Sequence, residues 1–173
     1  MRRHGQSGFS LPELLMVIAL MGILSGISVW TMRGYQRTAR LNSAVDMIGA
    51  DIRKARLHVF TSAEEYYIDF EPKTSSYVLN GISRIQLPEG ISFGADKEVT
   101  GRPTDPYTLP PKDGITFKGD GTENRALFLT KGLVIPTGAV YLTNGKETIA
   151  ITVALSGHTT FWRSKGGTKW AEI

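Results

Sequence analysis

Residues 8–30 read GFSLPELLMVIALMGILSGISVW, and this stretch decides how the rest of the chain is interpreted. From Leu14 to Trp30 it contains no charged side chain. About 22 helical residues counted from Phe9, at roughly 1.5 Å each, span about 33 Å, enough to cross a hydrocarbon core of about 30 Å. The stretch therefore predicts a transmembrane helix over residues 9–30. Its expected membrane-anchoring side chains are Leu14, Leu15, Val17, Ile18, Leu20, Ile23, Leu24 and Ile27.

One carboxylate, Glu13, lies near the start of this apolar run. A charged group in or near hydrocarbon is costly unless it is paired, so its presence indicates a function. A cleaved secretory signal is the alternative interpretation, because a basic start followed by an apolar stretch is also typical of that segment. No Ala-x-Ala sequence follows the run, and a secretory signal has no use for Glu13. The sequence therefore favours a retained helix.

The eight residues Gly8-Phe9-Ser10-Leu11-Pro12-Glu13-Leu14-Leu15 resemble the class III signal of type IV pilins and type II secretion pseudopilins. The resemblance implies a basic leader over residues 1–8, cleavage by a prepilin peptidase between Gly8 and Phe9, and methylation of the new amine of Phe9. It also implies that Glu13 acts in filament assembly. A carboxylate in an apolar bundle needs a cation with hydrogen-bond donors, and the amine of an incoming subunit can supply both.

A second helical pattern follows the apolar run. Its apolar residues recur at alternating spacings of four and three: Leu41, Val45, Ile48, Ile52, Ala55 and Val59. This periodicity predicts an amphipathic, extracytoplasmic helix over residues 31–60, continuous with the first segment and interrupted by a glycine only at Gly49 in its second half. The opposite, arginine-rich face is expected to be solvated or to contact lipid headgroups and neighbouring subunits.

From residue 61 to residue 173 the pattern changes to short β-rich runs separated by turn residues. The strands expected are residues 66–70, 77–79, 91–93, 115–117, 126–129, 139–142, 149–153 and 159–162. Residues 72–76 predict a hairpin turn, and Asn144-Gly145 predicts a second tight turn. The expected fold class is α+β, with a long N-terminal helix packed on an antiparallel β-sheet head.

The spacing of the last strands, with Gly132, Gly138 and Gly157 at their turns, resembles the head of the H-type minor pseudopilins and of their FimT-like pilus relatives. The resemblance implies a non-catalytic minor pseudopilin at the tip of a type II secretion pseudopilus, or in its initiation. The alternative is a FimT-like minor pilin of a type IV pilus that binds DNA during uptake. In such relatives an arginine follows a glycine near the C-terminus, whereas here His158 follows Gly157.

The same resemblance implies a location and a set of partners. The protein would be a single-pass protein of the bacterial inner membrane, with its C-terminal head in the periplasm. Its partners would be the prepilin peptidase, the membrane, and other pilins or pseudopilins in a hetero-oligomeric filament.

The net charge of +4 gives little support to a nucleic-acid partner. Arg2 and Arg3 belong to the predicted leader, and without them 18 basic side chains stand against 16 acidic ones. The predicted head alone has 12 basic and 13 acidic side chains. Its candidate nucleic-acid contacts are three cations close to Trp170, namely Arg163, Lys165 and Lys169, and three cations make a weak patch.

Catalytic and metal-binding patterns are missing from the sequence. It has no cysteine, and its three histidines, His4, His58 and His158, are isolated from one another. We therefore expect no enzymatic activity, no cofactor and no small-molecule substrate.

A long Pro-rich segment over residues 94–114 is expected to be an exposed loop that either contacts a partner or varies freely. Its acidic residues Asp96, Glu98 and Asp105 lack the regular alternation of a calcium-binding loop. We therefore expect no metal site there.

Overall fold

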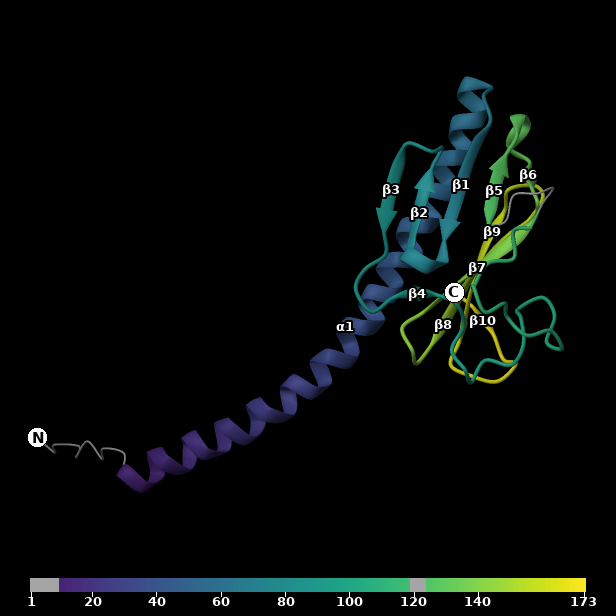
Figure 1. The fold of residues 1–173 in the computed structure, drawn as a ribbon. Helices are drawn as coiled ribbons and strands as arrows, with labels where there is room; N and C mark the ends of the chain where they lie inside the picture. Colours follow the sequence, from purple (N-terminus) through teal and green to yellow (C-terminus); the bar gives the residue numbers. More distant parts are fainter. Residues whose placement is uncertain (1–9, 119–123) are drawn as a thin grey trace, which may run out of the picture. The chain divides into compact units, whose positions relative to one another are not determined.

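The structure is a computed structural model that describes residues 10–118 and 124–173; within its helix, the side chains of residues 27–31 and 33 lie outside this description. The chain divides into two compact units, Met1–Gln36 and Arg37–Ile173. Helix α1 (Leu11–Ser62) has 52 residues and contains parts of both units (Figure 1). The prediction of one long N-terminal helix is confirmed. In the described part of the chain, no helix is both long enough and apolar enough to cross a membrane.

The second unit contains two antiparallel sheets of five strands each (Figure 1). The order of the first is β3 (Ser83–Gln86), β2 (Ser76–Leu79), β1 (Tyr66–Glu71), β5 (Arg125–Phe128) and β6 (Val134–Ile135). The order of the second is β10 (Ala171–Glu172), β9 (Thr159–Ser164), β8 (Thr148–Val153), β7 (Gly138–Thr143) and β4 (Ser92–Phe93). Two short 3-10 turns, η1 (Pro72–Thr74) and η2 (Thr130–Gly132), complete the unit. The predicted α+β class is confirmed.

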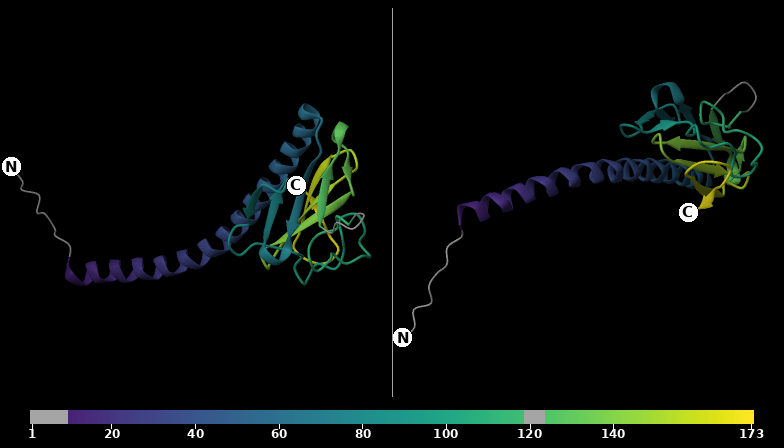
Figure 2. Two further views of the ribbon diagram at one scale, coloured as in Figure 1. Left: turned by 45° about the horizontal axis from the view of Figure 1, so that its top comes forward. Right: turned by 90° about the horizontal axis from the view of Figure 1, so that it is seen from below.

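The main core of this unit joins α1 to both sheets, whose arrangement Figure 2 shows from two further directions. All six residues of the predicted helical stripe are at most 4% exposed. On β8 the alternate residues Ile149, Ile151 and Val153 face this core, as the two-residue period of a strand requires. The ring of Phe70 stacks on that of Phe117, with centroids 5.8 Å apart. The stripe therefore holds the helix against the sheets by apolar burial.

Gly49 lies where α1 and β9 approach each other closely. A Cβ atom at this position would lie 2.8 Å from Cζ of Phe161. Because real contacts of a Cβ atom are longer, the glycine allows the phenylalanine ring to rest against the helix backbone. The single interruption of the helical pattern is thus a packing feature.

One predicted strand is wrong. Residues 115–117 form no strand, and Ile115 makes only an isolated bridge with Val140. The backbone N–H of Thr116 donates to the carbonyl of Ala139 at 3.0 Å, but the N–H of Ala139 returns to the Thr116 hydroxyl at 2.6 Å. Because a side chain takes the place of a backbone acceptor, the ladder stops there. Strands β3, β6 and β10 were not predicted; two of them have only two residues, too few to show a period.

Candidate functional site

The predicted processing and assembly residues lie at the beginning of α1. Gly8 and Phe9 lie outside the described residues. Glu13 is exposed in the first turn of the helix, and its backbone N–H donates to the carbonyl of Ser10 at 3.0 Å. Pro12 is the second helical residue, where its missing N–H removes no intrahelical bond. The positive end of the helix dipole stabilises a carboxylate at this position.

The predicted anchoring residues form an exposed apolar surface on the next turns of the helix. Leu14, Leu15, Val17, Ile18, Leu20, Ile23 and Leu24 are between 40% and 65% exposed, and the side chain of Ile27 lies outside the description. The hydroxyl of Ser25 donates to the carbonyl of Met21 at 2.7 Å, so this polar group is satisfied within the helix. A contiguous apolar surface of this kind is typical of a site that contacts lipid or other proteins.

The three predicted cations near the C-terminus have different environments. Arg163 is half-buried, and its guanidinium donates to Oδ1 of Asn42 at 2.6 Å and lies 3.9 Å from the carboxylate of Glu147. Lys165 and Lys169 are exposed. Arg163 therefore connects β9 to α1, and only the two lysines offer their charges to solvent.

Trp170 is folded back onto the second sheet. This position leaves its ring less free to stack on a nucleic-acid base. Its ring packs edge-on against Tyr141, with centroids 6.0 Å apart, and its indole N–H donates to the carbonyl of Gly101 at 3.0 Å. Burial raises the pKa of Tyr141 to about 12, so its hydroxyl is neutral at ordinary pH. The pair belongs to a small apolar cluster on the face of the sheet away from the main core.

The segment over residues 94–114 is attached to the fold at both ends and in its middle. Gly94 donates to the carbonyl of Tyr141 at 2.9 Å, and Tyr141 donates to the carbonyl of Gly114 at 2.7 Å, so the two ends meet on one residue of β7. Val99 is buried and bridges to Gly167. Tyr107, by contrast, is 96% exposed. The prediction of an exposed loop is correct for its tip and wrong for its anchored parts.

Two acidic residues of this segment, Asp96 and Asp105, accept hydrogen bonds in local turns. Oδ1 of Asp96 accepts the backbone N–H of Glu98 at 3.1 Å. Asp105 accepts hydrogen bonds from the Thr108 hydroxyl and from the backbone of Tyr107, and these lower the pKa of its carboxyl. Within the described residues, no three histidine or carboxylate side chains lie close enough to bind a metal ion together.

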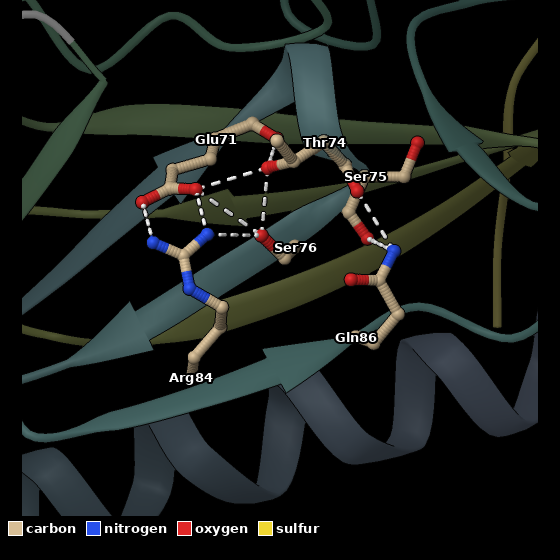
Figure 3. Close-up of polar contacts among 6 residues, drawn as sticks. All are labelled: Glu71, Thr74, Ser75, Ser76, Arg84 and Gln86. Atoms are coloured by element: carbon tan, nitrogen blue, oxygen red, sulfur yellow. Dashed lines mark hydrogen bonds and ion pairs between the residues drawn. The ribbon is translucent and has the colours of Figure 1, made fainter.

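Figure 3 shows a polar cluster on strands β1 to β3 and the turn η1 between β1 and β2. Arg84 forms a two-pronged ion pair with Glu71, and its Nη2 lies 2.9 Å from Oε1 of that carboxylate. The hydroxyl of Thr74 donates to Oε2 of Glu71 at 2.9 Å, and Ser76 and Gln86 bond to the same hairpin. Bonding to Arg84 and then to Thr74 lowers the pKa of Glu71. Through the ion pair of Arg84 and the bonds of Gln86, the cluster fastens β3 to the turn at η1.

The two described histidines lie in different surroundings. The ring of His58 lies against that of Tyr66, with centroids 5.2 Å apart. His158 lines a cavity of about 290 Å³ together with Arg102, Tyr141 and several threonines. This cavity contains polar groups, but its lining includes neither a carboxylate nor a serine that could act with His158.

Comparisons with known proteins bear on the N-terminal segment. A family model described as the prokaryotic N-terminal methylation motif matches residues 3–29. Comparison with curated proteins and with solved structures gave no significant match. The matched segment contains the predicted cleavage site, Glu13 and most of the exposed apolar surface. This motif implies processing by a prepilin peptidase and assembly into filaments with other pilins. Proteins of this kind are structural, non-catalytic subunits, and the match supports a type IV pilin-like protein.

Proposed function

We propose that this chain is a minor pseudopilin of a type II secretion system, a non-catalytic subunit of the tip or initiation complex of the periplasmic pseudopilus. The observation that carries the proposal is the methylation motif over residues 3–29, with Glu13 in the first turn of a helix whose next turns expose apolar side chains. Before assembly, residues 9–30 anchor the protein in the bacterial inner membrane, with residues 61–173 on the periplasmic side.

The chemistry of the assembly step follows from the cleavage. Cutting between Gly8 and Phe9 creates a cationic amine four residues before Glu13, about one helical turn away. The amine of one subunit can then pair with Glu13 of its neighbour. In an apolar bundle a charged hydrogen-bonded pair is stable only when both partners are present, so a misplaced subunit leaves two unmatched charges. Glu13 thereby sets the axial register of the filament.

Electrostatics favours secretion over DNA uptake. The head has 12 basic and 13 acidic side chains, so it has no general attraction for phosphate. Arg163 bonds to Asn42 and Glu147, and Trp170 packs against Tyr141, which leaves Lys165 and Lys169 as a minimal patch. A nearly neutral surface of this kind is better suited to contact with other protein subunits than to binding along the phosphate backbone of a nucleic acid.

Processing is tested first, by intact-mass analysis of the protein from membranes. We expect a mature chain that starts at Phe9 with a methylated amine. A chain that still starts at Met1, or one cut after the apolar run, would refute the proposal.

The role of Glu13 is tested by crosslinking to the other filament subunits. Glu13→Gln keeps the shape of the side chain and removes its charge, so cleavage and membrane insertion should be retained while crosslinking falls. Glu13→Asp is the matched control, because it keeps the charge. Equal crosslinking by all three proteins would contradict the register mechanism.

The cellular system is tested with a strain that lacks the gene. Loss of enzyme secretion, restored by the wild-type chain and not by Glu13→Gln, supports the pseudopilin assignment. Normal secretion together with loss of DNA uptake would instead identify a FimT-like minor pilin.

A further inference from the structure

Two adjoining cavities lie along the C-terminal part of α1 in the second unit and share Arg53 and Arg56. One, of about 190 Å³, is also lined by residues of the turn between β8 and β9 and by the start of β9: Gly157, His158, Thr159 and Phe161, with Ile52 from α1. The other, of about 310 Å³, is completed by Leu57 and Phe60. Neither lining contains a carboxylate. We call the two cavities together the Arg53/Arg56 groove.

Arg56 is held in place by the backbone around it. A Cβ atom would lie only 3.4 Å from its Nε at Gly132 and 3.1 Å at Gly157. Both glycines have φ near +73°, a conformation that residues with side chains rarely adopt. The guanidinium carbon also lies 5.9 Å from the centre of the Phe60 ring. Two glycine turns and an aromatic ring therefore pack closely around the side chain of Arg56 and restrict its position.

One donor of Arg56 has no partner within the described part of the fold, and neither arginine of the groove is paired there with a carboxylate. Nε of Arg56 is buried and has no hydrogen-bond partner among the described residues. Neither Arg53 nor Arg56 forms an ion pair within the described chain, whereas four other arginines do: Arg40, Arg84, Arg125 and Arg163. Buried donors are nearly always bonded, so an arginine fixed in place with unused donors suggests that its partner comes from outside the chain.

The apolar wall of the groove adds a second requirement for the ligand. Leu57 is 64% exposed and Phe60 is 55% exposed, directly beside the two guanidinium groups. A ligand that satisfies the whole groove thus carries a carboxylate next to an apolar side chain. We propose that the Arg53/Arg56 groove binds an acidic and apolar segment of another filament subunit, with its carboxylate on the two arginines and its apolar side chain on Leu57 and Phe60. The identity of the partner as a filament subunit rests on the proposed function.

A nucleic acid fits this groove less well. Binding to a phosphate backbone needs a row of cations along the strand, and the head has no excess of basic side chains. Stacking of bases needs a free aromatic face, but the Phe60 ring already has Arg56 over it. DNA is therefore the competing outcome of the test.

The binding test uses the full-length protein in detergent micelles and a fluorescein-labelled peptide of alternating glutamate and leucine. Fluorescence anisotropy should show binding of this peptide and at least about tenfold weaker binding of the matched glutamine and leucine peptide, because charge-assisted bonds are lost. Arg53→Gln combined with Arg56→Gln should weaken binding about tenfold or more. Arg37→Gln is the matched control, since it removes an exposed arginine of the same helix, and it should leave affinity unchanged.

Three results would overturn the proposal. The glutamate peptide could bind no better than the glutamine peptide, or Arg37→Gln could weaken binding as much as the double variant. A single-stranded DNA oligonucleotide could also bind more tightly than the peptide and lose affinity with the same two arginines. Circular dichroism of each variant shows that its fold is retained.

A crosslinking test in cells identifies the partner. A photo-reactive amino acid at Leu57 should capture a filament subunit through a segment that contains Asp or Glu, and the double arginine variant should remove this product. The same photo-reactive group at Tyr107, which is 96% exposed outside the groove, is the control. The mature N-terminus is measured in the same samples. Normal cleavage at Phe9 without arginine-dependent capture refutes the groove alone, whereas absent cleavage refutes the proposed function.

Discussion

Replacing Tyr77 with phenylalanine should measurably weaken the second unit. The hydroxyl of Tyr77, on β2, donates to Oδ2 of Asp51, on α1, at 2.6 Å. Tyr77 is fully buried, and the side chain of Asp51 is 8% exposed. Burial, followed by the bond to Asp51, raises the pKa of Tyr77, so the hydroxyl remains a donor throughout the ordinary pH range. The bond therefore fastens the helix to the first sheet through a buried carboxylate.

The expected loss follows from the charge of the acceptor. Without the hydroxyl, Oδ2 of Asp51 keeps no hydrogen-bond donor among the described residues. The partner that remains for the carboxylate is Nζ of Lys54, which lies 3.2 Å from Oδ1 on a side chain that is 77% exposed. A hydrogen bond to a charged group contributes about 1.5–3 kcal/mol. For a chain of this size that corresponds to a fall of roughly 3–12 °C in the unfolding midpoint. The phenylalanine ring keeps the contact with Phe70, so packing changes little.

The assay is urea unfolding of the full-length protein in detergent, followed by the fluorescence of its tryptophans. Tyr107→Phe is the matched control because its ring is 96% exposed, and its effect should stay within about 0.5 kcal/mol. In an Asp51→Asn background the Tyr77→Phe change should cost less, about 0.5–1.5 kcal/mol, because the acceptor is neutral. The reasoning is refuted if Tyr77→Phe costs no more than Tyr107→Phe, or if the Asp51 and Tyr77 effects are strictly additive.

Three further predictions concern the loop and the surface of the head. Gly114→Ala should cost about 3 kcal/mol or more in urea unfolding, because its Cβ would lie 2.1 Å from the nitrogen of Gly94; Gly90→Ala, with a similar positive φ and open space, should cost only about 1–2 kcal/mol, and equal costs would exclude the steric explanation. The lowered pKa of Glu71 means that its pairing with Arg84 stabilises the fold above the ordinary glutamate value of 4.5 and is lost as the pH falls through the lowered pKa; the stability difference between wild type and Arg84→Gln should therefore shrink on acidification, and a constant difference would contradict the linkage. Trp170→Ala removes the bond to Gly101, so tryptic cleavage after Lys97 and Lys112 should accelerate while cleavage after Lys73 does not, and unchanged rates would show that Trp170 does not hold the loop.

Local pattern was enough to predict the helical part of this protein. The spacing of Leu41, Val45 and Ile48 reports the period of a helix directly, because each turn returns a side chain to the same face. The N-terminal motif is likewise a run of neighbouring residues, and residues 3–29 match it without any tertiary information. The longer strands also follow from alternation within one segment.

Contacts between residues far apart in the chain decided the roles of arginines that the sequence pattern had left open. The arginine-rich helix face was expected to be solvated or to contact lipid headgroups and neighbouring subunits. Arg56, however, packs against Gly132 and Gly157, which follow it by more than 70 and by more than 100 residues in the chain. Arg163 was a candidate nucleic-acid contact, and its bond to Asn42 reveals a structural role.

By itself, the sequence determined the long N-terminal helix, its buried stripe, the α+β class and the pilin-like start, since each depends on residues close together in the chain. The tertiary structure alone decided that residues 115–117 leave the ladder, that the ends of the 94–114 loop meet on Tyr141, and which arginines keep unused donors. The physical reason is that a hydrogen-bond or ion-pair partner is selected by distance in space, and folding brings together groups that no local period relates.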